Sequence, residues 1–280
     1  MKKLSIFLAL FMVGSAVAQV KTPQPSPRAE LKQTVGLTEV EVSYSRPSSK
    51  GRIVYGNLVP FGRVWRTGAN ASTTVSFSDD VTIDGKSLKK GTYALFTIPK
   101  ADSWDIIFYT NIDNWGVPDP WDESKVALKT TAKTQILSRP IETFTIGING
   151  LDNNYGHLEI SWERTLVAVK FEVPTEKTAM ASIQKVMAGP SAGDYFSAAQ
   201  YYYQSGTDMK TALEYVNKAV AMSKDAPFWY TRQKSLIQAK MGDRTGAIET
   251  AKLSLAAAQK ANNQDYVKMN QDSIAEWSRK

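Results

Sequence analysis

Cysteine is absent from this chain of 280 residues, and histidine occurs once, as His157. Without cysteine the protein can form no disulfide, no thiolate metal site and no cysteine nucleophile. A zinc site needs several histidine or cysteine ligands, so we expect no metal, and no glycine-rich nucleotide motif points to a cofactor. A serine triad built on the single histidine is not favoured. No motif identifies a reaction. Whether the protein is an enzyme therefore stays open, and the lack of a catalytic motif favours a protein that is not an enzyme.

Long apolar runs are scarce, and the most informative one lies near the N-terminus. Two lysines precede an apolar run at 4–13, which is shorter than the ~20 residues that a bilayer core requires. The small residues AVA at 16–18 then match a signal-peptidase site. We therefore predict a signal peptide over 1–18, a new N-terminus at Gln19, and export to the periplasm, the extracellular space or the cell surface. No later run is long enough to span a bilayer, so we expect no transmembrane segment in the mature chain.

Acidic residues are fewer than basic ones, with 27 against 34, and the formal net charge is +7. The lysines are scattered rather than run together, so we expect no nucleic-acid partner. We interpret the excess positive charge as surface charge that keeps the protein solvated and attracts it weakly to anionic polymers of the cell envelope.

What the sequence does contain is a hydrophobic period that changes along the chain. Residues 19–28 include three prolines and predict an extended lead-in, whereas residues 40–44 alternate between apolar and polar as in a half-buried strand. The dipeptide Asp84-Gly85 suits a tight hairpin turn. Many short strands with no helical stretch between them predict an antiparallel β-sandwich or barrel-like domain over 29–174. The expected strands lie at 40–44, 73–77, 81–83, 92–98, 104–109, 126–134, 142–148, 157–162 and 166–173.

After Pro174 the apolar residues recur at helical spacing. This predicts a helical domain over 175–280 and, with the strands before it, an α+β protein of two domains. Thr175 is the expected N-cap of the first helix, and Gly189-Pro190 is expected to terminate it.

The helical domain contains an internal repeat. Sliding the chain by 35 residues aligns the helix-face residues of 212–221 with those of 247–256. The period resembles that of tetratricopeptide repeats over about 193–262, although the usual tryptophan and Leu-Gly pattern of the first helix is missing. A last helix at about 265–278 is expected to cap the stack with its charged side outward.

The segment 46–70 gathers four arginines, a lysine and Trp65 in a stretch with little strand character. In one interpretation the arginines tie loops to the sheet and the tryptophan is core. In the other, Arg52, Arg63 and Arg66 converge on a carboxylate or phosphate, because a guanidinium group suits bidentate binding.

A second segment, 111–123, places Trp115 and Trp121 among four carboxylates. Aromatic planes beside acids suit a sugar ring, whose C–H face stacks while its hydroxyls form hydrogen bonds. A calcium site lacks the ordered ligand spacing that such loops show, and a plain surface loop with buried tryptophans is the third alternative.

Three stretches carry a family resemblance: PSPRAELKQTVGLTEVEVSYSRPSSKGR, VPFGRVWRTGANASTTVSFSDDV, and GTYALFTIP with WDIIFYTN. Together they resemble the domain of unknown function 2911 family (DUF 2911) over about 25–173. The resemblance implies an exported protein of Bacteroidetes-like bacteria, often with helical repeats behind the domain, and it brings no established activity. It makes its motif residues candidates for a shared site or a structural knot: Arg46, Pro47, Gly51, Arg52, Trp65, Arg66, Gly68, Ala69 and Asn70.

Three hypotheses follow for function. The first is a non-enzymatic binding protein of the cell envelope, with an anionic or carbohydrate ligand on the β domain and a protein partner on the repeats. The second is an envelope glycan or ester hydrolase that uses carboxylates of 111–123. The third is a structural role in which the arginines brace the fold. The candidate ligand-binding residues are Arg46, Arg52, Arg63, Trp65, Arg66, Asn70, Trp115 and Trp121.

Overall fold

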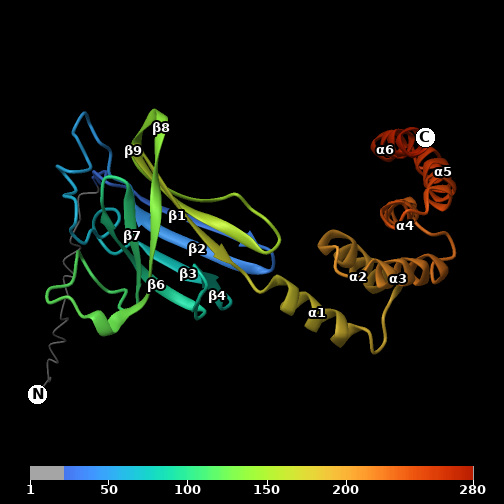
Figure 1. The fold of residues 1–280 in the computed structure, drawn as a ribbon, viewed down its shortest axis with the longest axis horizontal. Helices are drawn as coiled ribbons and strands as arrows, with labels where there is room; N and C mark the ends of the chain where they lie inside the picture. Colours follow the sequence, from blue (N-terminus) through green and yellow to red (C-terminus); the bar gives the residue numbers. More distant parts are fainter. Residues whose placement is uncertain (1–21, 280) are drawn as a thin grey trace, which may run out of the picture. The chain divides into compact units, whose positions relative to one another are not determined.

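The computed structural model describes residues 22–279, and the predicted signal peptide with its cleavage site lies outside the described residues. The chain divides into two compact units, which we call the β unit and the helical unit. The β unit comprises the residues up to Gln33 together with Glu39–Leu151 and Gly156–Phe171, and the helical unit comprises Thr34–Thr38, Asp152–Tyr155 and Glu172–Lys280. Strands followed by helices confirm the predicted α+β class (Figure 1).

Within residues 22–279, nine strands form one antiparallel sheet in the order β1-β2-β3-β6-β7-β8-β9-β4-β5. The edge strand β1 was not predicted. The hairpin predicted at Asp84-Gly85 is confirmed, because both residues have positive φ angles, 51° and 71°, between β4 and β5. The strands are β1 (Arg28–Val35), β2 (Thr38–Ser45), β3 (Thr74–Phe77), β4 (Val81–Ile83), β5 (Lys86–Leu88), β6 (Gly91–Pro99), β7 (Ser103–Tyr109), β8 (Val126–Asn149) and β9 (Tyr155–Glu172).

Two strands are longer than the sequence predicted. The prediction divided β8 and β9 into two strands each and is wrong, because they run without a break for 24 and 18 residues. Strand β8 pairs with β7 up to Lys133 and with β9 from Thr134 onward. Pro140 lies where the β8–β9 register shifts, between Ile136 and Ile141, and an irregular pairing tolerates a residue without a backbone donor.

The central strands β6 and β7 are buried on both faces. On one face, Phe108 of β7 packs against Phe77, which in turn packs against Phe171 of β9. On the other face lie Ala94, Phe96, Ile107 and Tyr109, and loop residues including Val64 and Trp121 cover them. The sheet therefore needs its long loops to bury the second apolar face of its central hairpin.

Six helices follow within the described residues: α1 (Thr175–Val186), α2 (Ala192–Ser205), α3 (Met209–Ala221), α4 (Phe228–Lys240), α5 (Arg244–Lys260) and α6 (Gln264–Trp277). Pro174 occupies the N-cap of α1 and makes no side-chain cap bond. The predicted cap at Thr175 is therefore wrong: Thr175 is the first helical residue, and its hydroxyl donates to the carbonyl of Asn153. Among residues 22–279, no helix has both the length and the apolar character needed to cross a membrane.

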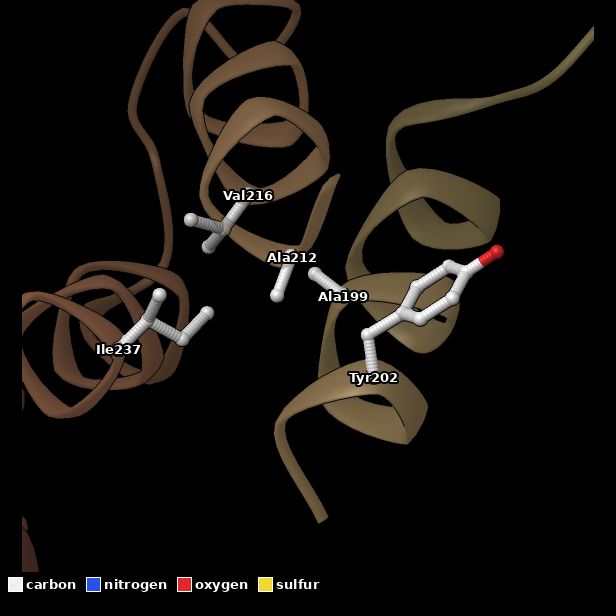
Figure 2. Packing of buried hydrophobic residues seen from close by; sticks show 5 residues of the cluster. All are labelled: Ala199, Tyr202, Ala212, Val216 and Ile237. Carbon is white, nitrogen blue, oxygen red and sulfur yellow. The ribbon is translucent and has the colours of Figure 1, made fainter. Parts of the chain in front are cut away.

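The helices pack as successive neighbours, α2 on α3, α4 on α5, and α5 on α6. Figure 2 shows one buried cluster, in which Ala199 and Tyr202 of α2 meet Ala212 and Val216 of α3 and Ile237 of α4. Small residues at the contacts let the helix backbones approach closely.

The helical unit repeats its capping pattern as well as its core. Asp208 caps α3 by accepting from the amide of Thr211, and Asp243, thirty-five residues later, caps α5 by accepting from the amide of Gly246. Ala212 and its repeat equivalent Ala247 are both fully buried. The alignment found in the sequence thus links helices that begin and pack in the same way.

Candidate functional site

An aromatic cluster underlies the arginine-rich segment 46–70. Trp65 stacks on Trp162 of β9, with ring centroids 6.1 Å apart and planes at 18°. Two backbone hydrogen bonds with Thr97 of β6, at 2.7 and 2.9 Å, fix Trp65 to the sheet. The indole of Trp162 donates to the carbonyl of Glu142 over 3.0 Å. Rings held in this way form a rigid base for the loops above them.

Tyr55 completes this cluster. Its ring meets Trp65, Trp104 and Trp162 edge-on, with centroids 4.8 to 6.4 Å apart. The hydroxyl is buried and has no hydrogen-bond partner among the described residues. Burial raises the pKa of this hydroxyl well above its ordinary value of 10.0, and the negative charge of Glu163 raises it further. Tyr55 is therefore a neutral packing residue.

Arg46 acts as a brace. Its Nε donates to the carbonyl of Phe144 over 3.0 Å, and its Nη2 donates to the hydroxyl of Thr145 over 2.8 Å. Its own amide donates to the carbonyl of Pro27 over 2.9 Å. These bonds tie three distant parts of the chain together, and they support the structural interpretation for this arginine.

The following turn is fastened to β8 through Glu142. The hydroxyl of Ser49 donates to this carboxylate, and so does the amide of Lys50, over 2.7 Å. The pKa of Glu142 is held below its ordinary value, first by the hydrogen bond from Ser49 and then by the bond from Lys50 and the nearby positive charges. The carboxylate therefore stays ionised and orders the turn that presents Lys50 and Arg52.

A cavity of about 430 Å³ opens beside this turn. Three cationic side chains line it, those of Lys50, Arg52 and Arg66, and its lining contains no acidic residue. Trp65 and Trp162 contribute aromatic surface. The remaining lining residues are Pro25, Ser26, Pro47, Ser48, Leu58, Val59, Gly68 and Ala69. A volume of this size is typical of sites for small ligands.

Both arginines of the cavity are oriented by backbone carbonyls. Nη1 of Arg66 donates to the carbonyls of Asn70 and Trp115, each over 3.1 Å. Nε and Nη2 of Arg52 donate to the carbonyls of Ser49 and Ser48, over 2.9 and 2.7 Å. Nε and Nη2 of Arg66 and Nη1 of Arg52 have no partner among residues 22–279, so these donors are free for a ligand.

The turn after Arg66 explains the glycine of the motif. Thr67, Gly68 and Asn70 all have positive φ angles, 54°, 146° and 60°. A Cβ on Gly68 would come within 2.9 Å of the Thr73 hydroxyl and 3.1 Å of the Ser45 carbonyl. The side chain of Asn70 donates to the carbonyl of Ser26 over 3.2 Å, so it anchors the lead-in and does not line the cavity.

The structure thus brings together only part of the predicted set. Arg52, Trp65 and Arg66 line the cavity, whereas Arg46 and Asn70 act as anchors beside it. Arg63 is exposed, has no hydrogen bond or ion pair within residues 22–279, and does not line the cavity. Lys50, which is not among the predicted site residues, lines the cavity with the two arginines. Its position next to the Ser49–Glu142 contact is not visible in the local sequence.

The two tryptophans of 111–123 have different environments. Trp115 is 75% exposed, whereas Trp121 packs on Phe96 and Tyr109, with centroids 5.3 and 4.6 Å away. The Trp121 indole donates to Glu123 over 3.1 Å. Trp121 is therefore mainly a cover for the sheet, and only Trp115 presents a free aromatic surface.

The carboxylates of this loop also have local roles. Asp122 accepts hydrogen bonds from the hydroxyl and the amide of Ser124, and these bonds lower the pKa of Asp122. A general acid needs the opposite shift. No group of three or more His, Asp or Glu side chains within residues 22–279 is arranged to hold a metal ion.

One string of the sequence has the letters of a nucleophile elbow, GPSAG from Gly189 to Gly193. Its serine, Ser191, is the N-cap of α2 and forms a capping box with Asp194. An elbow requires a strand before the turn, and α1 precedes this one. The string is therefore a helix cap.

The fold and the cavity together define an antiparallel β domain with a cationic pocket. The sequence profile of the family described as "Protein of unknown function (DUF2911)" matches residues 26–171, which is more than half of the chain, and the protein belongs to this family. This match ends before the helices, so their likeness to tetratricopeptide repeats stays a prediction. Searches of curated proteins and of solved structures each find no match.

Proposed function

We propose that the protein is a non-enzymatic binding protein of the bacterial cell envelope whose β unit takes a small anionic ligand. The observation that carries this proposal is the cavity lined by Lys50, Arg52 and Arg66 with no acidic residue. Glu142 offsets part of the charge of Lys50 and Arg52 from outside the lining, and a carboxylate or phosphate in the cavity neutralises the remaining positive charge. Two guanidinium groups held by carbonyls are already oriented, so binding costs little side-chain entropy.

The aromatic surface in the cavity limits the shape of the ligand. The rings of Trp65 and Trp162 suit an apolar or sugar-like face next to the anionic group. An acidic sugar or a phosphorylated small molecule combines both properties. A neutral sugar uses only half of the site and is expected to bind more weakly.

The helical unit is proposed to hold a protein partner. Its repeated caps at Asp208 and Asp243 and the equivalent buried alanines support a tetratricopeptide-like stack, an architecture that presents an extended surface to peptides. Export to the envelope follows from the predicted signal peptide at 1–18. The lowered pKa of Asp122 does not suit the role of general acid, which the hydrolase hypothesis would need from a carboxylate of this loop.

Calorimetric titration of residues 19–280 tests the ligand site. The probes are inorganic phosphate, glucuronate and glucose, and the variants are Arg66→Gln and Lys50→Gln. Arg63→Gln is the matched control, because it removes the same charge from an exposed position outside the cavity. The two cavity variants should weaken anion binding about tenfold or more, as expected when a charged hydrogen bond is lost.

Three results would contradict the proposal. If neither anion binds the wild-type protein, the cavity is not an anion site. If Arg63→Gln weakens binding as much as Arg66→Gln does, the binding reflects net charge and not the cavity. If glucose binds as tightly as glucuronate, the cations do not select the ligand. Circular dichroism spectra of the variants establish that each one is folded.

A further inference from the structure

Exposed large apolar side chains of the β unit concentrate in two loops. The segment 53–61 exposes Ile53, Leu58 and Phe61, and the segment 112–117 exposes Ile112, Trp115 and Val117. Trp115 and Ile53 are the most exposed of these, at 75% and 66%. In the described part of the β unit, only two further large apolar side chains are exposed, Ile136 and Leu151. We call the two loops together the apolar rim. A concentration of this kind marks an interaction surface.

The second loop of the apolar rim is fastened to residues 66–72, which follow the first loop in the chain. The amide and the hydroxyl of Ser72 donate to the carbonyl of Asn114, over 2.9 and 3.0 Å. Nη1 of Arg66 donates to the carbonyl of Trp115. Arg66 also lines the cavity together with Leu58 of the first loop, so it connects the second loop to the cavity that the first loop borders.

The first loop is also rigid within itself. The amide of Val59 donates to the carbonyl of Val54 over 2.8 Å, and the amide of Gly56 donates to the carbonyl of Val59 over 2.9 Å. Gly56 has a φ angle of 87°, and a Cβ there would lie 2.9 Å from the ring of Phe61. A turn built in this way presents Leu58 and Phe61 to solvent in a fixed position, although their exposure is unfavourable for an isolated molecule.

Cationic side chains accompany the apolar rim. No acidic residue occurs from 42 to 78, and this stretch contains Arg46, Lys50, Arg52, Arg63 and Arg66. Arg63 follows Phe61 closely, is exposed, and has no partner within residues 22–279. The only acidic residue of 112–117 is Asp113.

The cavity and the rim are continuous, because Leu58 lines the cavity and is also 43% exposed. We propose that this end of the β unit docks on an anionic phospholipid surface, with a headgroup phosphate in the cavity and Leu58, Phe61 and Trp115 in the lipid interface. Tryptophan and phenylalanine flanked by arginine and lysine are the residue types that bind at this interface. Lysine and arginine near the surface are attracted to anionic lipid. The headgroup assignment rests on the proposed anion site.

Vesicle co-sedimentation of residues 19–280 tests the inference. Vesicles of phosphatidylcholine mixed with phosphatidylglycerol are compared with vesicles of phosphatidylcholine alone. The double variant Phe61→Ser and Trp115→Ser removes apolar surface without touching the cavity. Leu151→Ser is the control, because Leu151 is 50% exposed in the turn between β8 and β9. Binding of soluble glycerol 3-phosphate is measured in parallel by calorimetry.

The wild-type protein should sediment with the anionic vesicles, and the double variant should lose about tenfold or more in partitioning while Leu151→Ser does not. The double variant should still bind glycerol 3-phosphate as the wild type does. If the wild type binds glycerol 3-phosphate but no vesicle, the membrane inference is overturned and the anion site stands. If it binds neither, both are overturned. Equal loss in the double variant and in Leu151→Ser also overturns the inference.

Discussion

The β unit and the helical unit bury different kinds of side chain. The largest fully buried side chains of the described chain all lie in the β unit, with Trp104, Trp162 and Tyr109 the biggest. The helical unit buries mainly alanine, and its interior also contains polar residues such as Ser254 and Asn270. One unit is thus held by large rings filling space between sheet and loops, and the other by close approach of helix backbones.

This difference predicts opposite sensitivities to substitution. Where large side chains fill the interior, shortening one leaves a cavity and loses many contacts at once. Where alanines let helices approach closely, lengthening one forces the helices apart. A substitution that is severe in one unit is therefore expected to be mild in the other.

The largest effect is expected for Trp104→Ala in β7. Trp104 is 1% exposed and packs edge-on against Tyr55 and Trp65. Its removal should lower the free energy of unfolding of the β unit by about 3–5 kcal/mol. Denaturant unfolding followed by near-ultraviolet circular dichroism measures this loss of unfolding free energy. Trp229→Ala in α4 is the control, because Trp229 is 42% exposed and should have a small effect. Similar losses of unfolding free energy in the two variants would contradict the expected difference between the two units.

A smaller effect is expected for Ala212→Leu in α3. Ala212 is fully buried in the cluster with Ala199 and Val216. Leucine has nearly the helix propensity of alanine, so the loss of stability reports mainly packing. Overpacking should destabilise the helical unit by about 1–3 kcal/mol. Helical circular dichroism during denaturation gives the value. Ala221→Leu, at the exposed end of the same helix, should change little, and a tolerated Ala212→Leu would show that the helices are not closely packed there.

The smallest effect concerns the cap of α3. Hydrogen bonds from the amide and then the hydroxyl of Thr211 lower the pKa of Asp208 from its ordinary value of 3.8. A lowered folded-state pKa means that the stabilisation is present above 3.8 and is lost as the pH falls through the lower value. Asp208→Asn keeps the cap without the charge and should reduce the fall in thermal midpoint on acidification. An unchanged pH dependence in that variant would count against a role for this cap.

Periodicity predicted most of the sheet, and one strand shows where it fails. In β2 the buried residues Val40, Val42 and Tyr44 alternate with more exposed ones, which is the pattern of a half-buried strand. The edge strand β1 also alternates, with Ala29, Leu31 and Val35 on its less exposed face, but only Val35 is buried. Gln33 interrupts the apolar side of this alternation, and an edge strand that is held mainly by backbone pairing leaves only a weak apolar period in the sequence.

The candidate site was predictable in composition and not in geometry. The sequence showed a concentration of arginines but could not distinguish Arg63 from Arg66, which lie in similar local surroundings. The distinction comes from the carbonyl of Trp115, forty-nine residues away, which orients Arg66. Lys50 was missed for the same reason, since Glu142, ninety-two residues away, positions its backbone.

The order of strands in the sheet also determines when the β unit can finish folding. Strand β9 lies between β8 and β4, although β4 precedes β9 by about half the length of the domain. The hairpin β4–β5 therefore has no partner in the sheet until the chain has been made as far as β9. Contacts of such long sequence separation form slowly, whereas each helix pair behind them can form from neighbouring residues. During synthesis from the N-terminus, the sheet therefore stays incomplete until β9 has been made, just before the first helix, α1.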